Sequence, residues 1–341
     1  MFSGNIAIDL GTASVIIYIE GKGIVLNEPS VVAFDSNTKR LIAAGNDAMK
    51  MLGRVSDSVT VAHPLMNGVI SDFTLTEQML KYFLGKVYKY NIFKPRAVVS
   101  IPSVVTTVER RTVVDVCRAV GIRKVALIEE PVAAAIGEGI DISRPYGTMV
   151  VDIGGGTTDI AVITLGSMAV TRSLKTAGSS FDEAIIRYIR KNYSVLVGEL
   201  TAEKIKKEIG CTLPHKKVKS MEAKGRNYIT GLPVSFHINS LQVFRALEEP
   251  LLEIINGIQE VLEKTPPELL GDILESGILM TGGGSLLMGL DKLITNKTGV
   301  FTCVARNAVS CIVLGAGKTL KHMEHLPDGS EVYSVRDCYR S

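Results

Sequence analysis

Two carboxylates flank a run of three glycines in residues 148–165, TMVVDIGGGTTDIAVITL. Two β-branched apolar runs surround the glycines, which predicts a strand, a tight turn and a returning strand. Glycine lets backbone amides approach a phosphate closely, and the Thr157 hydroxyl adds a hydrogen bond. Asp152, at the end of the first strand, can hold a metal ion through its water shell. The stretch therefore predicts a phosphate and metal site, with an ordinary glycine turn as the alternative.

A second copy of this pattern lies near the N-terminus. Residues 5–19 again consist of an apolar strand, Asp-x-Gly and a returning strand, with Asp9 in the place of Asp152. The two copies are about one domain length apart, which predicts two related lobes whose turns face each other across a cleft. A third glycine element, residues 277–285, is predicted as a strand that leads into a helix, whose N-terminus would favour part of a nucleotide.

Together these segments resemble the actin, Hsp70 and sugar-kinase superfamily of ATPases, and more narrowly the bacterial actin homologues MreB and Mbl. The resemblance covers nearly the whole chain. Its segments are IDLGTA from residue 8, GIVLNEPSVVA from 23, KPR from 94, VERR from 108, LIEEPVAAAI from 127, VVDIGGGTTD from 150, TGLP from 230, EKTPPEL from 263 and LMTGGGS from 279. All of them occur in the family's order, which makes the match highly specific.

The resemblance implies an α/β, actin-like two-lobed ATPase fold. Each lobe is expected to hold a mixed β-sheet flanked by helices and to carry a small outer subdomain. The expected first lobe comprises residues 1–140 and 316–341, with its outer subdomain at about 35–70. The expected second lobe comprises residues 141–315, with its outer subdomain at about 182–245.

The resemblance also implies that ATP binds between the lobes together with Mg²⁺. The residues assigned to the nucleotide are Gly11, Thr12, Ala13, Ser14, Gly154, Gly155, Gly156, Thr157, Glu203, Lys204, Ile205, Lys206, Gly282, Gly283, Gly284 and Ser285. Asp9 and Asp152 are assigned to Mg²⁺ through water. Taken alone, residues 201–209 predict a charged surface helix that begins at an N-cap-like Thr201. Only the resemblance implies that Glu203 and Lys206 reach the ribose and adenine side of the nucleotide.

Glu130 follows a strand predicted at residues 125–128 and precedes an alanine-rich helix. A carboxylate at such a strand end can orient or deprotonate a water aimed at a γ-phosphate. The resemblance gives Glu130 this catalytic role, with Thr157 helping to hold the water. The alternative is a carboxylate that only complements the helix dipole. We expect a slow ATPase that produces ADP and phosphate and is coupled to polymerisation. Ser14 replaces the family's usual asparagine. If this change alters phosphate binding, we expect a filament that hydrolyses ATP poorly.

Ile92 and Phe93 lie in a predicted loop before Pro95, after an amphipathic helix predicted at residues 76–90. The family uses an apolar loop at this position to enter the membrane. The alternative is that both side chains pack against the neighbouring helix. No segment reaches the roughly 20 apolar residues of a membrane span.

Charge and cysteine content favour a cytoplasmic protein that does not bind nucleic acid. The 38 Lys and Arg residues nearly balance the 35 Asp and Glu residues. The most basic run, residues 215–226, lacks interleaved aromatic residues and is predicted to be an exposed, β-rich outer subdomain. The five cysteines are odd in number and lack C-x-x-C spacing, so we expect reduced thiols and no metal cage.

The resemblance implies a cytoskeletal homopolymer, in double protofilaments, at the inner leaflet of the cytoplasmic membrane. Such filaments determine rod cell shape by organising cell-wall (peptidoglycan) synthesis, with RodZ, MreC, MreD and wall-synthesis enzymes as partners. The alternative is a soluble monomeric ATPase of the superfamily, chaperone-like or kinase-like. We expect an Hsp70-type chaperone to continue well beyond Ser341, and a small-molecule kinase to carry a catalytic base in place of the Glu130 arrangement.

Overall fold

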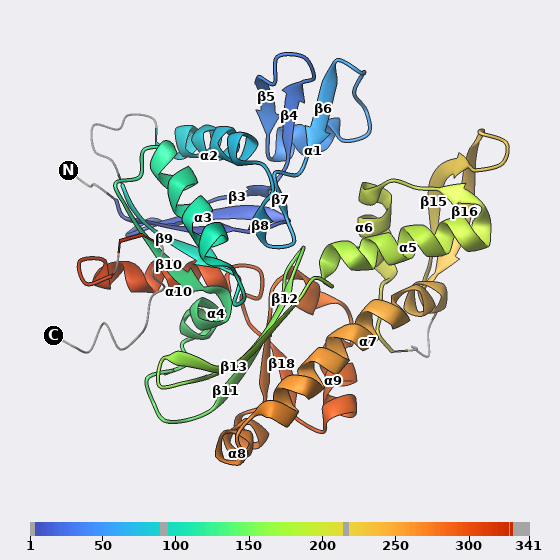
Figure 1. The fold of residues 1–341 in the computed structure, drawn as a ribbon. Helices are drawn as coiled ribbons and strands as arrows, with labels where there is room; N and C mark the ends of the chain where they lie inside the picture. Colours follow the sequence, from blue (N-terminus) through green and yellow to red (C-terminus); the bar gives the residue numbers. More distant parts are fainter. Residues whose placement is uncertain (1–3, 89–94, 214–217, 327, 330–341) are drawn as a thin grey trace.

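The computed structural model describes residues 4–88, 95–213, 218–326 and 328–329 (Figure 1). Two five-stranded mixed sheets, each flanked by helices, form the body of the protein, and smaller sheets project from it. The predicted α/β class is therefore confirmed. The expected lobe boundaries stay a prediction.

The strands are β1 Ile6–Leu10, β2 Ser14–Ile19, β3 Gly23–Pro29, β4 Val32–Asp35, β5 Leu41–Ala44, β6 Val59–Ala62, β7 Leu65–Met66, β8 Val69–Ile70, β9 Arg96–Ile101, β10 Lys124–Glu129, β11 Thr148–Ile153, β12 Thr158–Thr164, β13 Ser167–Leu174, β14 Val195–Leu196, β15 Ser220–Asn227, β16 Pro233–Asn239, β17 Ile278–Thr281 and β18 Thr302–Val304. The helices are α1 Asn46–Met51, α2 Phe73–Val87, α3 Thr107–Ala119, α4 Glu130–Glu138, α5 Gly178–Tyr193, α6 Glu199–Ile209, α7 Ser240–Lys264, α8 Pro267–Ser276, α9 Leu290–Thr298 and α10 Cys311–Thr319, with short 3₁₀ helices η1 Gly283–Leu286 and η2 Leu320–His322.

The two large sheets have the same strand plan. The first has the order β10-β9-β1-β2-β3, and the second, written from its other edge, has the order β18-β17-β11-β12-β13. In each sheet an antiparallel meander of three consecutive strands is extended by two later strands that run parallel to its first strand. The internal repeat that the two Asp-x-Gly segments predict is therefore a repeat of the whole sheet.

Helices α4 and α10 lie between the two sheets and share one apolar cluster with both. Alternation along β1 explains the layering, because Ile6 and Ile8 belong to the cluster on one face of the first sheet and Ala7 to the cluster between the sheets. The backbones of the two helices touch. A Cβ atom on Gly315 would lie 1.8 Å from the carbonyl oxygen of Ala133, and one on Gly137 would lie 2.0 Å from that of Cys311. Only glycine permits this contact.

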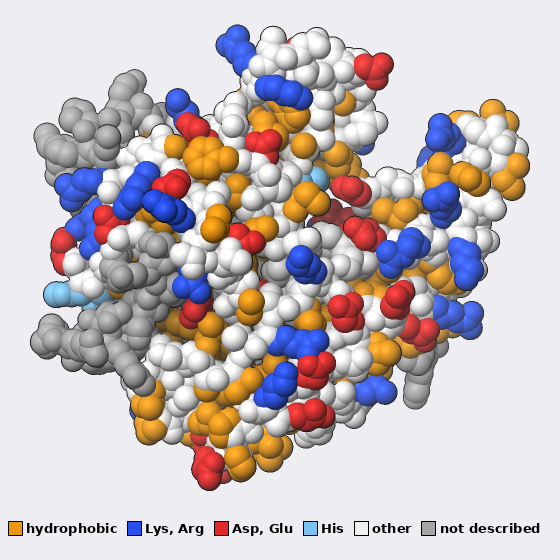
Figure 2. Space-filling view, viewed as in Figure 1, with side chains coloured by type: hydrophobic (Ala, Val, Ile, Leu, Met, Phe, Trp, Pro, Cys, Tyr) orange, Lys and Arg blue, Asp and Glu red, His pale blue; other side chains and the backbone are white. Residues whose placement is uncertain are grey.

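Small sheets and helices form the outer parts of the molecule. Strands β5, β4 and β6 form one small sheet beside α1, and strands β14, β15 and β16 form another beside α5 and α6. The surface is hollowed between these two outer parts (Figure 2).

Two expected helix starts and one expected helix type are wrong. Helix α2 begins at Phe73, three residues early, because the Asp72 carboxylate accepts a hydrogen bond from the Leu75 amide and caps it. Helix α6 begins at Glu199 after Gly198, so Thr201 lies inside the helix. The third glycine element leads into the four-residue 3₁₀ helix η1 instead of an α-helix.

Candidate functional site

Three glycine turns meet at the ends of the central strands of the two sheets. The first turn (residues 11–13) joins β1 to β2, the second (154–157) joins β11 to β12, and the third (282–285) follows β17. A Cβ atom on Gly155 would lie 2.5 Å from the Ala13 Cβ, and one on Gly156 would lie 2.5 Å from the Thr12 Oγ1. The first two turns are therefore in direct contact, as the sequence repeat predicts.

The third turn packs on the end of β11. Gly282 has a positive φ of 79°, and a Cβ atom there would lie 2.3 Å from the Ile153 carbonyl oxygen and 2.9 Å from Asp152 Oδ1. Ser285 is buried and its hydroxyl donates to the Gly282 carbonyl over 2.7 Å. Ser14, at the start of β2, is half-buried. The structure thus brings most of the proposed phosphate residues together.

Backbone amides of the turns are available to a ligand. Gly11 and Gly154 close their own turns by donating to the carbonyls of Ser14 and Thr157. Within the residues that the structure describes, the amides of Thr12, Ala13, Gly155 and Gly156 have no hydrogen-bond acceptor. Groups of free amides in glycine turns form concave sites for anions such as phosphate.

Four carboxylates lie buried beneath the turns: Asp9, Glu130, Asp152 and Asp159. Two of them are held in the same way in the two sheets. The Ser100 hydroxyl of β9 donates to Asp9 over 2.8 Å, and the Thr281 hydroxyl of β17 donates to Asp152 over 2.6 Å. Each hydroxyl comes from the parallel strand next to the aspartate, so the repeat extends to the neighbours of the carboxylates.

Burial raises the pKa of every member of this cluster. The pKa of Asp9 rises to about 6 and that of Asp152 to about 7, in each case mainly because the charged form is desolvated. Burial also raises the pKa of Glu130 well above its usual range, and the charges of Asp159, Asp152 and Asp9 raise it further. A site with these properties favours a cation, because positive charge relieves both desolvation and repulsion.

The donor groups fit a hydrated divalent cation. Asp159 accepts hydrogen bonds from the Ser103 amide and hydroxyl at Oδ1, while its buried Oδ2 has no hydrogen-bond partner in the described part of the chain. Among the described residues, no three His, Cys, Asp or Glu side chains converge closely enough to ligate a metal directly. In the described part of the chain, Asp9 and Asp152 would therefore hold such an ion through water.

The two proposed catalytic residues lie in this region. Glu130 is the first residue of α4 and is 7% exposed, so it is both a helix N-terminal carboxylate and a member of the buried cluster. Thr157, also buried, ends the second turn. The position of Glu130 suits a residue that acts on a water beside bound phosphates, and it equally suits the helix dipole.

The remaining nucleotide candidates lie in α6, and their side chains have different surroundings. The Lys206 ammonium group donates to Asp182 over 2.7 Å and to the Gly178 carbonyl over 2.8 Å, both in α5. Glu203 pairs with Lys207 and Lys204 with Glu208 along the surface of the helix. Ile205 is buried in the core of the second sheet. Lys206 is thus joined to a helix that contacts the second turn, since the amides of Gly178 and Ser179 donate to the carbonyls of Gly154 and Gly155.

The hairpin between β7 and β8 is a neighbour that sequence reasoning missed. The Gly68 amide donates to Thr12 Oγ1 over 2.8 Å, and a Cβ atom on Gly68 would lie 3.0 Å from the Thr157 Cγ2. Sequence reasoning also missed Ser100, Ser103 and Thr281. Their signal was a lone hydroxyl at the end of an apolar strand, which carries little information until the strand order is known.

The proposed membrane residues, Ile92 and Phe93, lie outside the described residues. None of the described helices combines the length and apolar character needed to cross a bilayer.

The strand plan and the paired glycine turns define the actin-like class of nucleotide-binding folds. Consistent with this, the chain is similar to the crystal structure of MreB 5 of Spiroplasma citri bound to AMPPNP, with a TM-score of 0.90, 38% identity and coverage of 94% of this chain and 97% of that chain. A MamK double helical filament matches in fold, with a TM-score of 0.80 and 22% identity over 95% of this chain and all of that chain.

Sequence comparison then identifies the family. The MreB/Mbl protein family matches residues 3–328, and the chain belongs to it. The cell shape-determining protein MreB of Escherichia coli (strain K12) is 46% identical over 330 residues, which is 95% of each chain. The cell shape-determining protein Mbl of Bacillus subtilis (strain 168) is 45% identical over 328 residues, or 96% of this chain and 98% of that protein. The expected family and actin-like fold are confirmed.

Proposed function

We propose that this chain is an ATP-dependent, actin-like cell shape-determining protein. The observation that carries the proposal is the contact of two glycine turns with free amides above four buried carboxylates. The relatives named as cell shape-determining proteins support the cytoskeletal role over a soluble chaperone or kinase. The Spiroplasma citri relatives bound to AMPPNP and ADP support an adenine nucleotide as the ligand.

In this proposal the turns hold the phosphates of ATP. The amides of Thr12, Ala13, Gly155 and Gly156, which lack an acceptor among the described residues, would donate to the phosphate oxygens. Residues 282–285 and α6 would contact the nucleoside. Asp9 and Asp152 would hold a hydrated Mg²⁺ through water, and such an ion would supply positive charge beside the phosphates. Of the α6 residues, Glu203 is the candidate to accept hydrogen bonds from the ribose hydroxyls.

Hydrolysis is proposed to depend on Glu130. In a buried carboxylate cluster its pKa is high, and a cation nearby would lower that pKa toward the range of a general base. Glu130 then orients and deprotonates the attacking water while Thr157 holds it in line. Closure of the two halves on assembly excludes bulk water, which couples hydrolysis to the filament state.

We further propose that the protein assembles with itself into double protofilaments at the inner face of the cytoplasmic membrane. Ile92 and Phe93 are the proposed membrane contact, and RodZ, MreC, MreD and wall-synthesis enzymes are the proposed partners in peptidoglycan synthesis. These elements rest on family resemblance. The two lobes, divided near residues 140 and 315, are the rigid units that move against each other.

Sedimentation with ATP, Mg²⁺ and lipid vesicles, read together with phosphate release, tests the proposal. Glu130→Gln should lower phosphate release by about 100-fold or more, because the general base is lost, while nucleotide binding persists. Glu129→Gln, one residue earlier, is the matched control and should keep most of the activity. Ile92→Ala/Phe93→Ala should abolish pelleting with vesicles and leave phosphate release in solution intact.

Other outcomes would contradict individual parts of the proposal. A chain that stays monomeric at all concentrations, with or without lipid, would support the soluble ATPase. Phosphate release by Glu130→Gln at the wild-type rate would show that Glu130 is not catalytic and only complements the helix dipole. Unchanged vesicle pelleting of the double variant would make Ile92 and Phe93 packing residues.

A further inference from the structure

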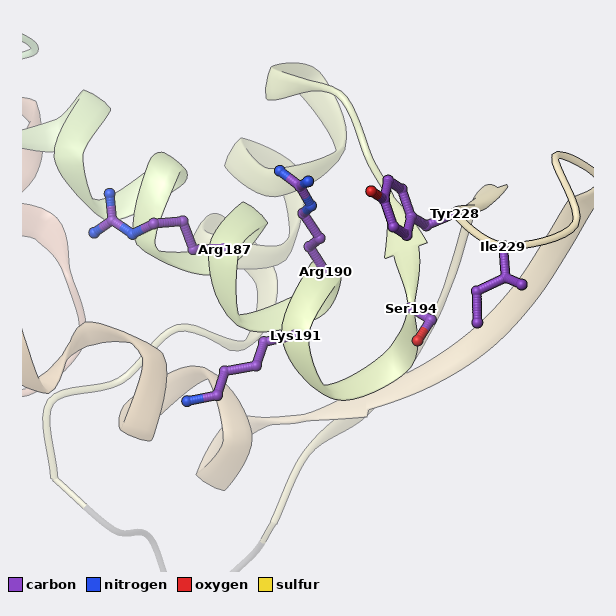
Figure 3. Close-up of a pocket in the computed structure, with 6 residues that line it drawn as sticks. All are labelled: Arg187, Arg190, Lys191, Ser194, Tyr228 and Ile229. Atoms are coloured by element: carbon purple, nitrogen blue, oxygen red, sulfur yellow. The ribbon is translucent and has the colours of Figure 1, made fainter.

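A basic groove lies far from the glycine turns, at the outer end of α5. It has a volume of about 460 Å³ and is lined by Arg187, Arg190, Lys191, Ser194, Tyr228 and Ile229 (Figure 3). One wall is the last part of α5 and the other is the tip of the hairpin between β15 and β16. Three of the six lining residues are cations and none is an anion.

Few carboxylates of the protein neutralise the cationic side chains of the groove. No carboxylate of the described residues lies within 4.0 Å of Arg190 or Lys191. Arg187 has only Glu183, 3.7 Å away on the same helix, and both side chains are largely exposed, so this pair is weak. The Arg190 guanidinium lies over the Tyr228 ring, 5.0 Å from its centroid, which keeps it on the groove side of the helix (Figure 3).

The opposite wall is apolar and exposed. Ile229 is 79% exposed and Tyr228 is 58% exposed at the hairpin tip. Cations in the last turn of a helix complement the helix dipole, which accounts for Arg190 and Lys191 alone. The dipole does not explain why Ile229 is exposed to solvent on the opposite wall of the groove. The combination is typical of a surface that binds a partner with both negative charge and an apolar side chain.

We propose that this groove binds an acidic segment of a partner protein. Carboxylates of the segment pair with Arg187, Arg190 and Lys191, and an apolar side chain of the segment packs on Ile229 and the Tyr228 ring. Walls on two sides suit an extended chain better than the flat surface of a bilayer. A single aromatic residue gives no stacking platform for successive bases, which disfavours nucleic acid. The groove does not depend on the nucleotide site.

Fluorescence anisotropy with the full chain, without nucleotide and at low salt, tests the proposal. The probe is a short labelled peptide of glutamate and aspartate around one leucine, and the control peptide replaces the acids with glutamine and asparagine. The acidic peptide should bind, and added salt should weaken it. Arg190→Gln/Lys191→Gln should weaken binding about tenfold, because ion pairs are lost. Ile229→Ser should weaken binding of the peptide that contains leucine and leave unchanged the binding of an acidic peptide without leucine.

A matched variant and two further probes separate the alternatives. Lys81→Gln/Lys175→Gln removes the same charge from two exposed sites elsewhere and should leave binding unchanged. Equal losses of peptide affinity in both double variants would overturn the proposal, because binding would then follow net charge. Failure of the acidic peptide, or equal binding of the neutral one, would also overturn it. Binding of phosphatidylglycerol vesicles or a single-stranded oligonucleotide that Arg190→Gln/Lys191→Gln abolishes, without peptide binding, would assign the groove to a membrane or to nucleic acid instead.

Discussion

Asp9 and Asp152 lie at matching positions in the two halves of the protein, and each has one hydroxyl neighbour to stabilise its charge. One hydrogen bond does not compensate for the loss of water around a buried carboxylate, so the pKa of each is raised. The fold therefore favours the protonated form of both residues. A cation bound beside them would reverse this preference, so we expect the stability of the chain to depend on pH and on such an ion.

The first prediction concerns this dependence. A carboxyl group whose pKa is raised on folding stabilises the protein at low pH and loses that contribution as pH rises through the folded pKa. Without Mg²⁺ and nucleotide, thermal stability should therefore fall from about pH 4, where aspartates of the unfolded chain titrate, and level off above about pH 7, because the folded pKa of Asp9 is about 6 and that of Asp152 about 7. Asp152→Asn should raise the Tm at pH 8 by about 2–4 °C and change it little at pH 4.

Two comparisons control this experiment. Asp57→Asn removes an exposed carboxylate and should not change the pH profile. Mg²⁺ with ADP should stabilise the wild type more than Asp152→Asn at pH 8. A Tm of Asp152→Asn that drops equally at both pH values would show that Asp152 has only a structural hydrogen bond to Thr281.

At the scale of the element, α6 provides the second prediction. Lys206 and Asp182 form an ion pair whose side chains are only 14% and 16% exposed, and one oxygen of Asp182 already lacks a hydrogen-bond partner within the described residues. Lys206→Met leaves a buried carboxylate uncompensated and should lower the free energy of unfolding by about 3 kcal/mol. Lys204→Met, two residues away, removes only an exposed pair and should cost less than about 0.5 kcal/mol.

Chemical denaturation without nucleotide measures this difference. If the two variants are equally stable and only Lys206→Met loses nucleotide affinity, Lys206 acts on the ligand and not through Asp182.

The third prediction concerns the contact of α4 and α10. A Cβ atom on Gly315 has no space beside the Ala133 backbone, so Gly315→Ala must separate the helices. We expect a loss of about 3 kcal/mol in the free energy of unfolding. Gly271→Ala in α8 is the control, because a Cβ atom there meets nothing within 4 Å, and it should be neutral or stabilising by up to about 1 kcal/mol.

Denaturation midpoints of the two glycine variants give the comparison. Equal stability of Gly315→Ala and the wild type would mean that the helices separate without cost, contrary to tight packing.

Repeated motifs carried most of the predictable information about these elements. The Asp-x-Gly hairpins recur in sequence, so their strands, turns and mutual contact could be expected before the fold was known. Helix starts were less predictable, because the start of α6 at Glu199 depends on Gly198, which makes no side-chain cap. Ser100 and Thr281 could not be found, because their roles depend on strands that pair across about 90 to 130 residues. Ser103 could not be found because its bond to Asp159 joins the two sheets, which the sequence does not place side by side.

At the scale of the whole molecule, assembly should control chemistry. If closure of the two halves completes the site around Glu130, phosphate release per molecule should be low below a critical protein concentration and rise steeply above it. Light scattering and phosphate release measured on the same dilution series test this. A release rate per molecule that is constant across the transition would separate hydrolysis from assembly.

The last segment of the body also affects how the protein is made. Ile312, Val313 and Ala316 of α10 belong to the cluster that covers Ala7 and Val98 of the first sheet. Synthesis proceeds from the N-terminus, so this face of the earliest strands has at most α4 as cover until α10 leaves the ribosome. During translation this sheet exposes apolar side chains for nearly the length of the message. The nascent chain should therefore need chaperone protection more than its final stability suggests.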